Sequence, residues 1–179
     1  DYIDAQLLQA YPGIYTRQQL EEWLYEPGLP TVMTVPRSSN LEAAAGAALA
    51  WSSGELAVDK LSRTAWSPQA SIYFIKALPA GLSQEQLAEL DRELGLSTSP
   101  NAEIARTWFI EVARRRYLPA YPDMREYLGR FGRTRLIEPV YRELVANGED
   151  GKLAREVFDA ARARYHPLTV AAIEASLGE

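Results

Sequence analysis

Three segments of the chain repeat one spacing of apolar side chains, and this spacing constrains the fold more than any other feature. Adjacent apolar pairs recur at i, i+4 and i+8 from Ile104 to Ala113, from Leu136 to Val145 and, less regularly at its end, from Leu153 to Arg162. Such a two-residue-wide stripe belongs to an α-helix that buries a broad face, so each helix is predicted to pack against two neighbours. Short loops ending in Gly132 and Gly148 predict antiparallel pairs of sequential helices.

The remaining segments also predict helices, so the expected fold is an all-α stack of helix pairs, similar to an α-solenoid. Thr16 with Gln19, and Ser83 with Gln86, have the spacing of capping boxes. Ser67-Pro68 predicts another helix start. Residues 72–75 alone could form a buried strand, but the preceding cap and the lack of a partner strand favour a helix.

Other helix boundaries are predicted from single residues. Asn40 is expected to cap an Ala-rich helix that runs to Trp51, and a weaker helix is expected from Glu55 to Leu61. Gly95 predicts a helix stop, and Ser99-Pro100 predicts the next start.

A proline-rich segment divides the sequence. Residues 26–39 contain three prolines and a glycine and exclude a helix, and no partner segment suggests a hairpin. We therefore predict a short helical remnant at residues 1–26, a linker at residues 27–39 and a helical domain at residues 40–179. Because the chain begins with Asp1 and carries no leader pattern, we expect it to be a piece of a longer protein.

Composition excludes several function classes. The chain has no Cys and a single His, His166, so it offers no Cys-based metal site and few ligands for catalytic zinc. We expect no cofactor in this chain and interpret His166 as a helix-start or packing residue. The longest apolar run, residues 43–51, is too short to span a bilayer, so no membrane partner is expected. The lack of Cys suits either the cytoplasm or the periplasm.

Arginine is concentrated in the second half of the sequence. Residues 91–179 carry 14 basic residues, of which 13 are Arg, yet their net charge is zero, whereas the whole chain has a net charge of −5. This balance favours paired contacts and carboxylate recognition over nucleic-acid binding. Arg114–Arg116 close a predicted helix, and we interpret them as solvated cations that complement the helix dipole.

A second arginine cluster lies around Gly132, which is predicted to end one helix in the left-handed conformation. Arg133 and Arg135 then lie in the turn and at the start of the next helix, where the dipole and free N–H groups favour an anion. Pro139 leaves two alternatives. Either the helix begins at Thr134 and contains Pro139, or it begins later and both arginines lie in the loop.

Four short segments, in order, resemble the leukotriene A(4) hydrolase type of zinc aminopeptidase. Residues 23–30 are similar to its W-L-x-x-P-G-L-P segment, and residues 101–108 to its N-x-E-I-x-x-x-W segment. Residues 132–135 resemble its G-R-x-K/R turn, and residues 166–169 its closing H-P-x-T segment. Together the matches extend over nearly the whole chain.

This resemblance implies the end of a thermolysin-like catalytic domain, then a proline-rich linker, then an armadillo-like superhelix that walls the active-site cleft. The family's zinc ligands and general-base Glu lie on H-E-x-x-H and a downstream Glu. This chain has neither motif, so both are expected upstream of Asp1. The resemblance assigns Arg133, with Arg135 beside it, to the C-terminal carboxylate of short peptide substrates. Human-type sequences have Lys where this chain has Arg135, which keeps the charge and changes the geometry.

The implied function is that of a non-catalytic C-terminal domain of a zinc aminopeptidase. Its expected partners are the peptide substrate and the catalytic domain of the same chain. A stand-alone α-solenoid that recruits a protein partner is the alternative. A nucleic-acid binder is a third hypothesis, which the net charge of −5 disfavours.

Overall fold

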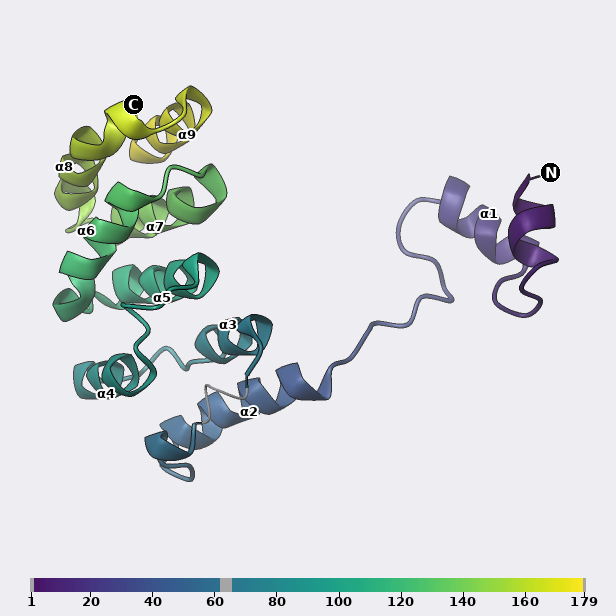
Figure 1. The fold of residues 1–179 in the computed structure, drawn as a ribbon, viewed down its shortest axis with the longest axis horizontal. Helices are drawn as coiled ribbons and strands as arrows, with labels where there is room; N and C mark the ends of the chain where they lie inside the picture. Colours follow the sequence, from purple (N-terminus) through teal and green to yellow (C-terminus); the bar gives the residue numbers. More distant parts are fainter. Residues whose placement is uncertain (1, 62–65, 179) are drawn as a thin grey trace. The chain divides into compact units, whose positions relative to one another are not determined.

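The computed structural model describes residues 2–61 and 66–178, and the chain divides into two compact units, residues 1–38 and residues 39–179 (Figure 1). The described residues form helices, turns and loops and no strand, so the predicted all-α class is confirmed. Residues 72–75 lie in a helix, as their preceding cap predicted.

The first unit contains a π-helical turn at Asp4–Leu8 and helix α1 at Arg17–Tyr25. The predicted capping box is present, since Gln19 N–H donates to Thr16 Oγ1 at 3.2 Å and Thr16 N–H donates to Gln19 Oε1 at 2.8 Å. Among the described residues of this unit only Pro30 is buried. The unit therefore has almost no core of its own.

The second unit is a two-layered array of helices. Helices α3, α5, α7 and α9 lie side by side in one layer, and α4, α6 and α8 form the other (Figure 1). Helix α2 packs on α3. The bounds are α2 Ser39–Ser52, α3 Pro68–Lys76, α4 Gln84–Leu94, α5 Ala102–Arg115, α6 Tyr121–Arg130, α7 Thr134–Ala146, α8 Gly151–Ala161 and α9 Pro167–Leu177, with 3₁₀ turns at Val58–Lys60, Leu118–Ala120 and Arg162–Arg164.

The two-residue-wide stripes bury the faces that their spacing predicts. Helix α7 contacts α5, α8 and α9, and helix α5 contacts α3, α6 and α7. All six stripe residues of α5 are buried, as are most of those in α7 and α8. Each helix thus meets at least two neighbours because its apolar face is broad.

Several predicted boundaries are confirmed and three are wrong. Ser67 and Ser83 cap α3 and α4, and Gly95 ends α4 with a φ of 56°. Helix α2 begins at Ser39, so Asn40 lies inside it, and residues 55–61 contain only a 3₁₀ turn. So short a segment, which begins directly after Gly54 with a φ of 81°, gains too few hydrogen bonds to offset helix nucleation.

The third wrong boundary is the start of α5. The cap is Asn101, whose Oδ1 accepts from the backbone N–H groups of Glu103 at 3.0 Å and Ile104 at 3.3 Å. Ser99-Pro100 lies just before it. An Asn side chain satisfies two orphan N–H groups at once, which outweighs the Ser-Pro signal.

Candidate functional site

The turn between α6 and α7 carries the predicted site. Helix α6 ends at Arg130, and Phe131 leaves it in an extended conformation while its N–H donates to the carbonyl of Tyr127 at 3.0 Å. Gly132 is not among the residues with positive φ, so its predicted left-handed conformation is wrong. Phe131 already turns the chain out of the helix, and no left-handed residue is needed.

The structure also decides between the two alternatives for Pro139. Helix α7 begins at Thr134 with Arg133 as its N-cap, and Pro139 lies inside it. Arg133 is therefore in the turn and Arg135 in the first turn of the helix. No side chain caps this helix start, so its first N–H groups still favour an anion.

The two candidate arginines differ in their partners. Both side chains are exposed. Arg135 forms an ion pair with Glu103 of α5, whose other oxygen pairs with Arg106 Nη2 at 3.4 Å. Within residues 2–61 and 66–178, no hydrogen bond or ion pair to the side chain of Arg133 is found. Of the two candidate arginines, Arg133 is thus the one that is available to an external carboxylate.

The segment that begins at Asn101 supports this site from the neighbouring helix. Asn101 caps α5, Glu103 holds Arg135, and the fully buried Trp108 donates its indole N–H to Ser97 Oγ at 2.9 Å. Glu103 was not predicted as part of the site. Its contact joins residues 32 positions apart in the sequence, so no local pattern reveals it.

The start of α9 lies against the other side of the turn. A Cβ atom built on Gly132 would lie 3.6 Å from Tyr165 Cδ1, and the Tyr165 hydroxyl donates to the carbonyl of Leu128 at 2.6 Å. His166 caps α9, since its Nδ1 accepts from Leu168 N–H at 3.2 Å. The interpretation of His166 as a helix-start residue is confirmed.

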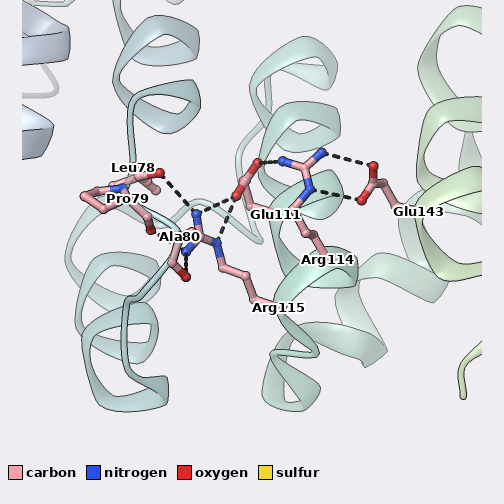
Figure 2. Close-up of polar contacts among 7 residues, drawn as sticks. All are labelled: Leu78, Pro79, Ala80, Glu111, Arg114, Arg115 and Glu143. Carbon is pink, nitrogen blue, oxygen red and sulfur yellow. Dashed lines mark hydrogen bonds and ion pairs between the residues drawn. The ribbon is translucent and has the colours of Figure 1, made fainter. Parts of the chain in front are cut away.

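The arginines at the end of α5 form a second charged cluster, drawn in Figure 2. Glu111 lies between Arg114 and Arg115, and Arg114 reaches on to Glu143 of α7. Arg115 points the other way and donates to the backbone carbonyls of Leu78, Pro79 and Ala80 (Figure 2). The side chain of Arg115 is only 9% exposed, so its interpretation as a solvated cation is wrong.

Burial of Arg115 has a physical cause. The connection between α3 and α4 turns over the end of α5 and leaves three carbonyls without helical donors. A guanidinium with five N–H donors satisfies them together with Glu111. This cluster joins α5, α7 and the connection between α3 and α4, and its charged groups are paired in contacts within the domain.

The described residues do not fit a catalytic metal site. They bring no group of three His, Cys, Asp or Glu side chains together as ligands, and we assign no step of zinc chemistry to this chain. In the same part of the chain, no helix combines the length and the hydropathy that a membrane span requires.

Comparison with known proteins decides the family. Residues 66–177, more than half of the chain, match the family model described as leukotriene A4 hydrolase, C-terminal. The chain belongs to the leukotriene A4 hydrolase family. Its relatives in this family include leucine aminopeptidase 2 of Neurospora crassa, which is 29% identical over 131 residues, 72% of this chain and 19% of the relative. The leukotriene A-4 hydrolase homolog of Botryotinia fuckeliana is 25% identical over 162 residues, 89% of this chain and 25% of the relative.

Solved structures of the family share the fold. Native leukotriene A4 hydrolase from Saccharomyces cerevisiae has a TM-score of 0.73 at 22% identity, over 99% of this chain and 32% of that protein. The yeast LTA4 hydrolase in complex with bestatin has a TM-score of 0.65 at 21% identity, over 89% of this chain and 29% of that protein. The chain thus spans about a fifth to a third of the length of its leukotriene A4 hydrolase relatives. The resemblance found in the sequence motifs is confirmed.

Proposed function

We propose that residues 40–179 wall the active-site cleft of a zinc aminopeptidase and that Arg133 binds the C-terminal carboxylate of short peptide substrates. The observation that carries this proposal is the unequal pairing of the two arginines. Glu103 pairs with Arg135, whereas Arg133 is exposed at the start of α7 and has no partner in the described parts of the chain. A guanidinium beside an uncapped helix start suits a carboxylate both by geometry and by charge.

Arg135 takes the second role in this proposal. Its side chain is 62% exposed despite the contact with Glu103, so it adds positive potential near the bound carboxylate. For Arg135 to bind the substrate directly, the substrate carboxylate would have to compete with the Glu103 carboxylate for its guanidinium. We therefore expect the loss of Arg133 to cost more than the loss of Arg135.

We further propose that residues 1–26 are the end of the catalytic domain and that residues 27–39 link it to the helical domain. Helix α1 has no buried residue, and Trp23, Leu24 and Tyr25 are 47%, 57% and 78% exposed. Three large apolar side chains on one short helix favour a packed neighbour from the rest of the catalytic domain.

The domain contributes to catalysis by positioning. In this proposal the zinc ligands belong to the catalytic domain, and zinc bound there would supply the Lewis-acid chemistry of peptide hydrolysis. Arg133 holds the far end of the peptide, so that the scissile bond is aligned without a further loss of orientational entropy. A charged contact of this kind contributes roughly 1.5–3 kcal/mol.

The test uses the full-length protein and compares a tripeptide that has a free C-terminal carboxylate with substrates that lack this charge. Arg133→Ala is expected to lower kcat/KM for a tripeptide by roughly one to two orders of magnitude. The same tripeptide with a C-terminal amide, and an aminoacyl-anilide, should be cleaved almost as before. An equal loss on all three substrates would contradict carboxylate binding by Arg133.

A further inference from the structure

The hydroxyl of Thr169 lies between the two residues that flank Arg133. Thr169 is 2% exposed in the first turn of α9 and donates to the carbonyl of Gly132 at 3.1 Å. Its Oγ1 also lies 2.7 Å from Oγ1 of Thr134. One buried hydroxyl thus contacts the backbone before Arg133 and the side chain after it.

The number of protons on each hydroxyl decides which group donates in these two hydrogen bonds. A hydroxyl has one proton to donate, and Thr169 uses it on the carbonyl of Gly132. Thr134 is therefore the donor in the contact between the two hydroxyls. The chain runs from Thr134 through Thr169 to Gly132, and every donor in it has an acceptor.

The carbonyl that accepts from Thr169 belongs to Gly132, the residue of the turn with the greatest backbone freedom. Gly132 has no Cβ, so its backbone has more accessible conformations than that of any other residue type. The peptide unit that carries its carbonyl also carries the N–H of Arg133, and its rotation would re-aim the Arg133 side chain. Tyr165 packs on one side of Gly132, and the hydrogen bond from Thr169 holds the carbonyl itself.

We propose that Thr169 is a positioning residue, which fixes the Gly132–Arg133 peptide so that Arg133 points at the substrate carboxylate. This inference rests on the proposed function. Thr169 touches no substrate in this proposal and acts through Arg133 alone. Its removal should therefore affect only substrates that carry the carboxylate.

The experiment compares variants of the full-length enzyme on a tripeptide and on the same tripeptide with a C-terminal amide. Thr169→Val keeps the shape of the side chain and removes the hydroxyl. It should lower kcat/KM for the free acid roughly tenfold, as expected for a misplaced positioning group, and leave the amide within about twofold. Thr169→Ser should restore most of the activity on the free acid.

A matched control removes a different buried threonine hydroxyl. Thr107 is 4% exposed, and its hydroxyl donates to the carbonyl of Glu103 in its own helix at 2.8 Å. Thr107→Val should leave the ratio of free-acid to amide activity unchanged. If Thr169→Val fails to fold, Thr134→Val removes the other hydroxyl at a partly buried position and should lower the same ratio by a smaller factor.

A double variant separates the two proposals. If Thr169 acts through Arg133, adding Thr169→Val to Arg133→Ala should cause no further loss on the free acid. If Arg133→Ala lowers activity on the free acid alone, but neither Thr169→Val nor Thr134→Val does so, the positioning role is overturned and the proposed function stands. Without a selective effect of Arg133→Ala, the proposed function fails and the inference fails with it. Equal losses on the acid and the amide from Thr169→Val would assign Thr169 a purely structural role.

Discussion

The guanidinium of Arg106 donates from Nη1 to the backbone carbonyl of Arg135 at 3.2 Å. This carbonyl would normally accept from the N–H of the residue four positions later, which is Pro139 and has no N–H. A side chain from α5 therefore supplies the hydrogen bond that the sequence of α7 removes. The same guanidinium pairs with Glu103, so the support of the helix start and the pairing of Arg135 are connected.

A double-mutant cycle tests this substitution of donors. Arg106→Met should lower the free energy of unfolding by about 2 kcal/mol, because it leaves the Arg135 carbonyl without a donor. In a Pro139→Ala background the Ala N–H can serve that carbonyl, so the same change should cost about 1 kcal/mol less. Urea unfolding followed by circular dichroism measures both. The lost contact with Glu103 cancels in the cycle, and equal costs in the two backgrounds would refute the explanation.

If the proposed peptide site is correct, Glu103 should weaken carboxylate binding there, since it offsets the charge of Arg135. In the full-length enzyme, Glu103→Gln is expected to lower KM for a free tripeptide by about two- to fivefold with kcat unchanged, the range of a partly exposed charge pair. The decrease should shrink in high salt. Glu143→Gln is the matched control, because Glu143 is similarly exposed and pairs with Arg114. A higher KM for Glu103→Gln would show that Glu103 positions Arg135 more than it neutralises it.

The neighbouring residues Arg114 and Arg115 should differ strongly in their contribution to stability. Arg115→Ala removes a buried guanidinium that serves three carbonyls and Glu111, and should cost about 3 kcal/mol. Arg114→Ala removes a side chain that is 52% exposed and should cost about 1 kcal/mol or less. Denaturant midpoints of the two variants decide the matter. Similar losses would mean that the carbonyl contacts of Arg115 contribute little.

Buried tyrosines predict unfolding at high pH. Burial raises the pKa of the hydroxyls of Tyr121, Tyr127, Tyr141 and Tyr165 above their ordinary value near 10. Above that pH the unfolded chain releases protons that the folded chain keeps, so the free energy of unfolding falls as pH rises. The stabilisation is complete below about pH 10 and is lost progressively above it.

Tyrosinate absorbance and circular dichroism, followed together from pH 8 to pH 12.5, test this expectation. The four buried tyrosines should ionise only together with the loss of the helical signal. Tyr141→Phe removes one of the groups with a raised pKa. The free energy of unfolding of this variant should therefore fall less between pH 7 and the alkaline range than that of the unchanged chain. Ionisation of Tyr121, Tyr127, Tyr141 and Tyr165 near pH 10 in a folded chain would contradict the prediction.

Local patterns determined much of the fold. The paired stripes of α5, α7 and α8 predicted helices with broad buried faces, because burial of apolar area sets that spacing. The caps at Thr16, Ser67 and Ser83 needed only residues three positions away. The motifs also identified the family, which depends on residue types and their order along the chain.

The tertiary structure decided what no local pattern contains. The sequence left the start of α7 open because Pro139 removes the hydrogen bond to the carbonyl of Arg135. Arg106, which lies 29 residues before Arg135 in the sequence, donates to that carbonyl instead. The sequence ranked Arg133 above Arg135 only by resemblance. In the structure, the ion pair between Arg135 and Glu103 gives a physical reason for that order. Arg115 was expected in solvent and is buried by carbonyls of a distant loop. In each case the deciding partner is far along the chain, and its contact exists only once the helices have packed.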